Sequence, residues 1–541
     1  MRLKTRSAEK TAVFQALQDS RVKPSPVNYL ECIYNSVISK TDVNRTKNTT
    51  VLKLMDVEKL SKLAKSKFDD ALFVVASNRE PYMHARTPDG IKCIRPASGM
   101  AIALDSIMQA CGGVWVAHGS GNADKNVVDE RDRIEVPEED GKYFLRRVWM
   151  NRDEEEGYYD ITSNEMFWPL CHTVYVRPKF DSSAWKQYKK INRRFAEAIL
   201  EEIGDRKAFV WFQDFHLSLA PAMVKETRRD VVTAHFWHIP WPQNETFRAC
   251  PWKNEILEGL LANDLIGFHT RYHCNNFLET VDRNIEAKTD RAEYSVSYRR
   301  HKTFVKPLPI SVDYEKIRGL AEQSVREGGV EALRKKHSLR GKFVGLGVER
   351  IDYTKGIPEK LKAYDLFLEK NPKYLGKTVY IQLGSPSRMR LEQYRKTNEE
   401  IEELVEEINW RYGTDDWTPV VYSPKHRDFR DIIPYYCLAD FCVVSSLHDG
   451  MNLVAKEYIS SKNDLDGTLL LSKFTGAFEE LKSALTVNPY DTRRFANVLR
   501  KLAKMKQCER RERMECMREA VRENNIYTWA GNVISNISKL S

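Results

Sequence analysis

A turn between a strand and a helix near residue 450 constrains the fold more than any other part of the chain. Residues 441–444 are a short apolar run that is typical of a buried parallel strand. Apolar residues at helical spacing follow the turn, at Val454 and Tyr458. The first amides of such a helix have no partner within it and carry partial positive charge, so a diphosphate would bind there. The pattern predicts an α/β sheet with a ligand at this edge.

The turn itself contains groups that suit a sugar nucleotide. Gly450 permits a tight turn and the close approach of a ligand to the backbone. Asp449 and Glu457 are far enough apart to serve different ligand groups, and each carboxylate can accept hydrogen bonds from sugar or ribose hydroxyls. The alternative is an ordinary turn with a solvated aspartate, because a strand, a turn and a helix with one glycine are common.

Length and composition indicate a globular protein of two or more domains. The chain has 541 residues, of which 42% are hydrophobic and 30% are charged. It contains no apolar run long enough to span a bilayer and no apolar core of a secretion signal. The ten cysteines are scattered without a Cys-x-x-Cys pair, as expected of buried thiols. We therefore expect a cytoplasmic protein without a membrane partner.

Most of the net charge of +10 belongs to the N-terminus. Residues 1–70 contain 14 Lys or Arg and 8 Asp or Glu, a net charge of +6. We expect a basic extension that is solvated or docks on the body, with a helical piece at residues 51–67. Nucleic-acid binding is not expected, because no basic stripe with interleaved aromatic residues is present.

Polar residues follow several apolar strands in the first half of the chain. Strands are predicted at residues 71–76, 113–118, 208–213 and 231–237. Arg79, Asp214 and His238 follow three of them, at the edge where parallel sheets bind ligands. Gly99, before a helix at 101–111, would let a phosphate approach the first amides. The alternatives are a surface arginine and a structural histidine.

Two histidines on one predicted helix resemble a metal pair. His269 and His273 are four residues apart, and Cys274 follows them. A structural or catalytic zinc site needs at least a third protein ligand. Since no third histidine or carboxylate is close in the sequence, we expect no metal here.

A second series of strands and helices starts after a proline-rich crossing at residues 307–313. Its first strand, at 342–348, is followed by Arg350 and Lys355. Two cations at one strand end suit a diphosphate leaving group, Arg as a fork and Lys as a point charge. The alternative is a local salt-bridge cluster with Glu349 and Asp352. Further strands are predicted at 379–383, 420–422, 441–444, 469–471 and 485–487.

The ordered motifs resemble the trehalose-6-phosphate synthase family of retaining glycosyltransferases. The resemblance covers about residues 71–535, and its motifs lie at residues 77–79, 159–168, 213–216, 238–242, 349–356, 387–388, 449–457 and 488–491. It implies the GT-B fold, an α/β fold in which two Rossmann-like domains face each other across a cleft and the last helix crosses back to the first domain. We expect an extension at 1–70, an acceptor domain at 71–311, a nucleotide-sugar domain at 312–524 and the crossing helix at 525–541.

The resemblance also implies a donor site. Arg350 and Lys355 would bind the diphosphate, and Asp449 would bind the donor sugar with neighbouring amides. Glu457 would bind the ribose, and His238 would lie beside the donor sugar. The resemblance implies further residues that bind the sugar-nucleotide donor. They are Gly99, in a loop that closes over the donor, and the residues whose backbone amides face it, Gly450, Met451, Asn452, Leu453 and Val454.

The implied acceptor site lies on the first domain and at one strand end of the second. Asp214 would bind sugar hydroxyls, while Arg79, Tyr159 and Arg388 would bind the acceptor phosphate, with Trp168 beside them. No metal or other cofactor is implied, because two protein cations face the leaving group.

Three departures from the family pattern leave the acceptor and the nucleotide open. The family's Gly-Gly-Leu loop is Ser98-Gly99-Met100 here. His118 stands where a tryptophan often shapes the acceptor pocket, and Arg427 where relatives place an aromatic residue against the nucleobase. UDP, GDP and ADP all remain candidates.

The resemblance therefore predicts a retaining glucosyltransferase that moves glucose from a nucleoside-diphosphate glucose to glucose 6-phosphate, giving trehalose 6-phosphate. The alternatives are another phosphorylated acceptor, such as glycerol 3-phosphate or a cyclitol phosphate, and a catalytically silent regulatory homologue. The expected partners are small-molecule substrates and a separate phosphatase that acts later, and a homo-oligomer remains open.

Overall fold

The computed structural model describes residues 55–95 and 99–540. Residues 54–541 form one compact unit, which contains all the described residues. Most of the predicted N-terminal extension and Ser98 of the predicted glycine loop lie outside the described residues. No described helix is both long and apolar enough to cross a membrane.

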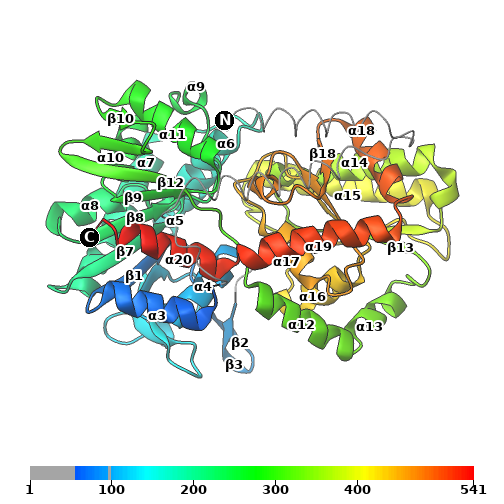
Figure 1. Cartoon of the computed structure of the whole chain (residues 1–541), viewed down its shortest axis with the longest axis horizontal. Coiled ribbons are helices and arrows are strands. Elements are labelled where there is room, and N and C mark those ends of the chain that lie inside the picture. Colours follow the sequence, from blue (N-terminus) through cyan, green and yellow to red (C-terminus); the bar gives the residue numbers. More distant parts are fainter. Residues whose placement is uncertain (1–54, 96–98, 541) are drawn as a thin grey trace, which may run out of the picture. The chain divides into compact units, whose positions relative to one another are not determined.

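The N-terminal lobe is built on a ten-stranded sheet in the order β10-β11-β12-β9-β8-β7-β1-β4-β6-β5. Figure 1 labels the strands β10, β12, β9, β8, β7 and β1 of this sheet. The strands from β12 to β6 pair in parallel, while β10–β11, β11–β12 and β6–β5 pair antiparallel. Their bounds are β1 Leu72–Ser77, β4 Val114–His118, β5 Arg133–Val136, β6 Tyr143–Val148, β7 Ala208–Gln213, β8 Val232–Phe236, β9 Leu265–Phe268, β10 Lys288–Asp290, β11 Ser295–Tyr298 and β12 His301–Pro307.

The C-terminal lobe is built on a six-stranded sheet in the order β15-β14-β13-β16-β17-β18, in which all neighbours are parallel. The strands are β13 Phe343–Arg350, β14 Thr378–Ser385, β15 Val420–Ser423, β16 Phe441–Val444, β17 Thr468–Ser472 and β18 Leu485–Val487. This sheet and the parallel part of the first confirm the expected pair of Rossmann-like domains.

Helices connect the strands in both lobes. Those longer than one or two turns are α3 Val57–Phe68, α4 Gly99–Cys111, α7 Ser182–Ile203, α8 Ala220–Thr227, α10 Lys253–Leu260, α11 Arg271–Asn284, α12 Tyr314–Arg326, α13 Gly329–Lys336, α14 Ile357–Lys370, α15 Glu392–Tyr412, α16 Phe429–Leu438, α17 Leu453–Ser461, α18 Thr492–Leu502, α19 Gln507–Glu523 and α20 Ile526–Ile537. Short helices are α5 Arg152–Glu155, α6 Trp168–His172 and α9 Asn244–Phe247, and a π-helix spans Glu156–Phe167.

The continuous apolar runs of the sequence form the central strands. Every residue of β7, β16 and β17 is buried, as expected for parallel strands covered on both faces. The strands predicted at the positions of β1, β4, β7, β8 and β13–β18 are confirmed. The antiparallel pair β5–β6 lies at the edge of the N-terminal sheet, next to the parallel strands.

The sequence did not predict the antiparallel strands β10–β12 or a separate two-stranded sheet. That sheet consists of β2 Met83–Thr87 and β3 Gly90–Ile94. Its strands are short, and β3 is almost wholly exposed, so it lacks the apolar run that identifies a central strand.

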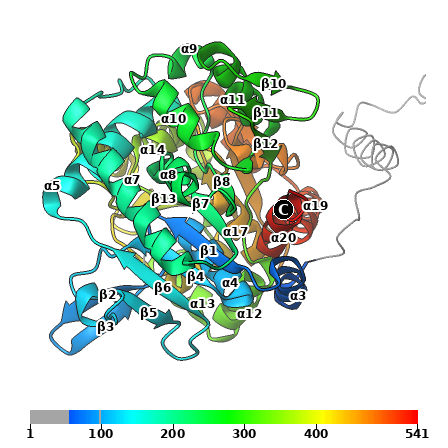
Figure 2. The same cartoon turned by 90° about the vertical axis from the view of Figure 1, so that its left-hand side faces the viewer.

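The last helix joins the C-terminal lobe to the N-terminal sheet. Helix α19 contacts α17 and β17, whereas α20 contacts α3 and α4, and Figures 1 and 2 show α20 beside α3. The Trp529 indole N–H donates to the Leu308 carbonyl at 3.0 Å, and its ring centroid lies 4.8 Å from that of Trp211 on β7. The expected crossing of the last helix is therefore confirmed.

We expect Trp529→Ala to destabilise the protein by about 3–5 kcal/mol, because it removes a buried indole and leaves a cavity beside β7 and β8. The exposed Asn532→Ala on the same helix is the matched control. Thermal unfolding measures the difference, and equal melting temperatures for the two variants would contradict the role of α20 as a tether.

Candidate active site

A cavity of about 290 Å3 is lined by residues of both lobes. It brings together nearly all the site residues predicted from the sequence: Arg79, Gly99, Tyr159, Trp168, Asp214, His238, Arg350, Lys355, Arg388, Asp449, Met451, Asn452, Leu453, Val454 and Glu457. Gly450 is not among the lining residues. The structure thus places the predicted residues in one site, while the role of each stays a prediction.

The parallel sheets explain why these residues meet. Most of the polar ones stand at or just after the carboxyl end of a strand: Arg79 after β1, Asp214 after β7, His238 after β8, Arg350 at the end of β13, Arg388 after β14 and Asp449 after β16. The carboxyl ends of parallel strands share one edge, and the two edges face the same cavity.

Lys355 and Asp449 form an ion pair between distant parts of the C-terminal lobe. Lys355 Nζ lies 2.6 Å from Asp449 Oδ2, which also accepts hydrogen bonds from Ser446 and Asn452. Burial opposes ionisation, but the lysine holds the pKa of Asp449 well below its usual range. Lys355 therefore does not form the alternative local salt bridge with Glu349 or Asp352. Glu349 pairs with Lys360.

The turn before α17 differs in detail from the prediction. The residue with a left-handed backbone is Asn452, with φ of 81°, and its side-chain oxygen caps the helix by accepting from the Ala455 N–H. Gly450 is required for another reason, because a Cβ there would lie 2.1 Å from the His238 carbonyl oxygen. Gly450 thus lets the C-terminal lobe approach the N-terminal lobe directly beside the cavity.

Three arginines surround the Tyr159 hydroxyl. Arg79 Nη2 donates to it at 2.7 Å, and the guanidiniums of Arg388 and Arg350 lie 4.5 and 5.6 Å from the centroid of the Trp168 ring. Burial raises the pKa of Tyr159, but Arg79, Arg388 and Arg350 together lower it to about 7. The cluster therefore carries an excess of positive charge that suits a phosphate.

Tyr159 belongs to the π-helix Glu156–Phe167. The sequence analysis identified residues 159–168 only as a motif, without a secondary structure. Such wider helical turns are rare and often occur at functional sites.

Asp352 organises the arginine cluster, a role that sequence reasoning missed. It is fully buried and accepts from the Trp168 indole N–H at 3.3 Å and from Arg388 Nη1 at 3.3 Å, while Arg350 Nη2 lies 4.0 Å away. In the sequence, Asp352 stands two residues after Arg350. That position indicated only a possible local salt bridge.

Asp214 and His238 form the N-terminal wall of the cavity. The backbone N–H of His238 donates to Asp214 Oδ1 at 3.1 Å, and Asp214 has a strained backbone with φ of 66°. Burial raises the pKa of Asp214 to about 7. Burial also lowers the pKa of His238, whose Nε2 lies 2.9 Å from Gln213 Oε1, so this ring is neutral.

Glu457 lies on the first turns of α17 and faces the same cavity. It accepts a hydrogen bond from the Tyr436 hydroxyl at 2.8 Å, and burial raises its pKa to about 7. A second acceptor oxygen remains for a hydroxyl of a ligand.

Two of the departures from the family pattern lie away from the cavity lining. The His118 ring N–H donates to the Val148 carbonyl at 3.0 Å. Arg427 donates to Ser423 at 2.9 Å and lines a separate pocket of about 240 Å3 beside β15. Neither side chain is among those that line the main cavity.

The histidines of α11 and the loop before it bind backbone carbonyls. His269 Nε2 lies 3.0 Å from the His238 oxygen, and His273 Nδ1 lies 3.2 Å from the Trp241 oxygen. Among the described residues, neither belongs to a group of three or more metal-binding side chains. His269 lines the cavity instead, which the sequence did not indicate. The other lining residues that were not predicted are Met100, Phe215, His216, Ile239, Ile310, Val348 and Glu349.

Comparison with known proteins agrees with this arrangement. The family description "Glycosyltransferase family 20" matches residues 71–539. A trehalose-6-phosphate synthase of Mycobacterium avium is 36% identical over 480 residues, which are 86% of this chain and 95% of the relative. An alpha,alpha-trehalose-phosphate synthase (UDP-forming) of Pichia angusta is 34% identical over 405 residues, covering 74% and 84% of the two chains.

Solved structures are similar over the same region. A structure from E. coli bound with UDP-2-fluoro glucose has a TM-score of 0.77 and 30% identity, and covers 87% of this chain and all of its own. An alpha,alpha-trehalose-phosphate synthase of Burkholderia xenovorans in complex with glucose-6-phosphate has a TM-score of 0.78 and 26% identity, with 86% and 100% covered. The match from residue 71 to residue 539 and the identity to these relatives show that the chain belongs to glycosyltransferase family 20.

Proposed function

We propose that the protein transfers glucose from UDP-glucose to glucose 6-phosphate with retention of configuration and forms trehalose 6-phosphate. The observation that carries this proposal is the single cavity that joins Lys355 and Asp449 to the arginine cluster around Tyr159. Such a cavity offers one place for a sugar diphosphate and another for a sugar phosphate.

The donor lies against the C-terminal lobe. Arg350 and Lys355 bind the diphosphate, and the first amides of α17 add partial positive charge. Asp449 accepts from hydroxyls of the donor glucose, and Glu457 accepts from the ribose. The names of the relatives from Pichia angusta and E. coli support a uridine nucleotide.

The acceptor phosphate lies among Arg79, Arg388 and Tyr159, and its hydroxyls lie near Asp214. Three guanidiniums converge near Tyr159, but the buried carboxylate Asp352 lies beside only Arg350 and Arg388, so a surplus of positive charge remains, which a phosphate neutralises. The Burkholderia xenovorans relative in complex with glucose-6-phosphate supports this acceptor.

The reaction follows from these positions. The acceptor hydroxyl attacks from the face that the diphosphate leaves, and an oxygen of the departing phosphate takes the proton. Arg350 and Lys355 stabilise the charge that develops on the leaving group. They act in place of a metal ion, so we expect catalysis without one. The walls of the cavity exclude water, which would otherwise hydrolyse the donor.

The cellular setting completes the proposal. We place the reaction in the cytoplasm, with a phosphatase that removes the phosphate of the product in a later step. Assembly into a homo-oligomer is compatible with the site, since both lobes that line it come from one chain.

Release of nucleoside diphosphate tests the function. UDP-, GDP- and ADP-glucose are each mixed with glucose 6-phosphate, glycerol 3-phosphate or a cyclitol phosphate. We expect the highest kcat/KM for UDP-glucose with glucose 6-phosphate and a non-reducing product. Preference for another acceptor would replace the proposed one, and no turnover with any pair would indicate a silent homologue.

We expect Arg350→Ala to lower kcat by about 100- to 1,000-fold, because one donor to the leaving group is lost. The assay uses EDTA-treated protein, so that a metal cannot take over the role. Arg340→Ala, which truncates a 95% exposed arginine in the same lobe, is the control. Near wild-type turnover of Arg350→Ala would refute the leaving-group role.

Asp214→Asn should remove a pH-dependent loss of stability. The pKa of Asp214 is about 7 in the folded state and lower in the unfolded state, about 3.9. The folded protein therefore binds more protons than the unfolded one between these values, and stability falls as pH rises through this window. The loss over the whole window is about 4 kcal/mol, since the two pKa values differ by about three units and one pKa unit corresponds to about 1.4 kcal/mol.

The measurement is the melting temperature of both proteins at pH 5 and pH 8. We expect Asp214→Asn to gain stability relative to wild type at pH 8 but not at pH 5, and to lose activity at both. An equal difference between the two proteins at both pH values would show that Asp214 does not titrate in this range.

A further inference from the structure

The small β2–β3 sheet carries two metal-binding side chains on one face. His84 of β2 and Cys93 of β3 are directly paired in the antiparallel register, so their side chains are cross-strand neighbours. His84 is buried, and Cys93 is exposed as a free thiol. This pair takes no part in the cavity described above.

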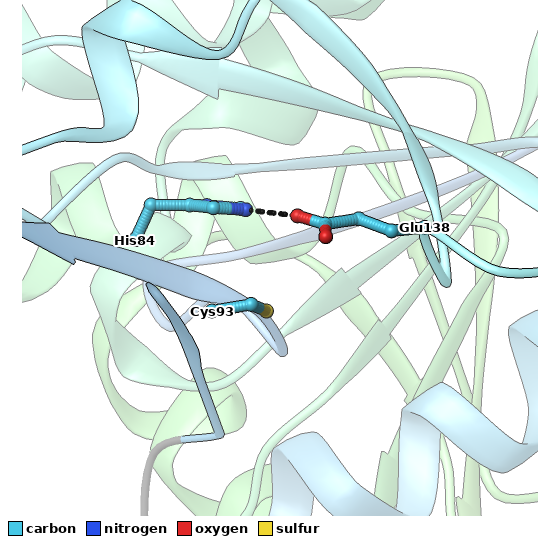
Figure 3. A group of neighbouring side chains, drawn as sticks. All are labelled: His84, Cys93 and Glu138. Atoms are coloured by element: carbon cyan, nitrogen blue, oxygen red, sulfur yellow. Dashed lines mark hydrogen bonds and ion pairs between the residues drawn. The ribbon is translucent and has the colours of Figure 1, made fainter. Parts of the chain in front are cut away.

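A third ligand comes from another element. Glu138 lies in the turn between β5 and β6, and its Oε1 is 2.7 Å from His84 Nε2 (Figure 3). The ligand atoms of His84, Cys93 and Glu138 all lie within 4.8 Å of one another. Within residues 55–95 and 99–540, this is the only group of three or more histidine, cysteine or acidic side chains with such spacing.

The donor set indicates the kind of ion. An imidazole nitrogen, a thiolate and a carboxylate are the three ligand types of zinc, and a thiolate is unfavourable for magnesium or calcium. A thiolate and a carboxylate also balance the charge of a divalent ion. We propose that His84 Nε2, Cys93 Sγ and Glu138 bind one Zn2+ ion, with water as the fourth ligand.

The surroundings of His84 suit this role. Its other ring nitrogen, Nδ1, lies 3.3 Å from Asp124 Oδ1, and its backbone N–H donates to the same oxygen at 2.7 Å. Arg147, which can only donate, is the nearer partner of Nδ1, so without metal the ring carries its proton on Nε2 and donates it to Glu138. Zinc binding would move this proton to Nδ1, where Asp124 can accept it, as carboxylates usually do beside ligating histidines. Asp124 is fully buried, so this partner is held in place.

One positive charge lies close to the site. Arg147 Nη2 is 2.8 Å from His84 Nδ1, but the guanidinium is shared between Asp124 at 3.0 Å and Glu80 at 3.1 Å. Asp124 offsets the charge of the arginine, whereas burial raises the pKa of Glu80 to about 8. The guanidinium also donates to the backbone carbonyl of Tyr82. The ion would bind on the opposite side of the imidazole, away from Arg147.

The ion would stabilise the β2–β3 sheet, which few other contacts hold in place. A two-stranded sheet alone is marginally stable, and β3 is almost wholly exposed. Protein hydrogen bonds to residues 121–126 hold β2, through His84 and Arg86. Zinc would add a bond from β3 to the β5–β6 turn.

The test measures zinc bound to the full chain. The reduced protein is stripped with a chelator, dialysed and titrated with Zn2+, and the metal content is determined by mass spectrometry. We expect one zinc per chain and a higher melting temperature with zinc than without. Co2+ in place of Zn2+ should give the near-ultraviolet band of a thiolate–cobalt bond.

The variants remove exposed ligands and so leave the buried network intact. Cys93→Ser should abolish the cobalt–thiolate band, and Cys93→Ser and Glu138→Gln should each weaken zinc binding at least about 10-fold. Cys508→Ser and Glu139→Gln change exposed residues of the same types and are the controls. Unchanged zinc binding in Cys93→Ser would overturn the proposal. So would an absence of stoichiometric zinc in the wild-type protein, which would leave His84 and Glu138 as a simple hydrogen-bonded pair.

Discussion

The arrangement of the cleft depends on an imbalance of buried charge. Arg79, Arg350 and Arg388 converge near Tyr159, and the carboxylate that holds two of them is Asp352. Burial and the neighbouring Arg388 lower the pKa of Arg350, which shows how unfavourable the cluster is by itself. An anionic ligand would relieve this repulsion, and in the proposed function that ligand is the phosphate of the acceptor.

Two features hold the cluster together across the cleft. The Trp168 indole of the N-terminal lobe donates to Asp352 of the C-terminal lobe, and its ring lies against both Arg350 and Arg388. Gly450 allows the backbone of one lobe to meet the His238 carbonyl of the other. The donor and acceptor groups therefore face each other at a spacing set by backbone and ring contacts rather than by flexible side chains.

The site also contains residues that lower the stability of the folded protein. Asp214 combines a strained backbone with a buried carboxyl, and Glu457 is a second carboxyl whose pKa burial raises. Apolar residues would pack there at lower cost. Residues that are unfavourable for folding and lie in one cavity are typical of function, because binding and catalysis need them where stability does not.

The sequence by itself determined most of the parallel strands of each lobe and the polar residues at their ends, such as Arg79, Asp214 and Arg350. These follow from local periodicity and from the rule that ligands bind at carboxyl edges. Only the tertiary structure decided that Lys355 pairs with Asp449, that Asp352 holds the arginines, that Asn452 rather than Gly450 takes the left-handed turn, and that His84 and Cys93 meet Glu138. Periodicity is a property of neighbouring residues, whereas these contacts join segments that only the packing of the whole chain brings together.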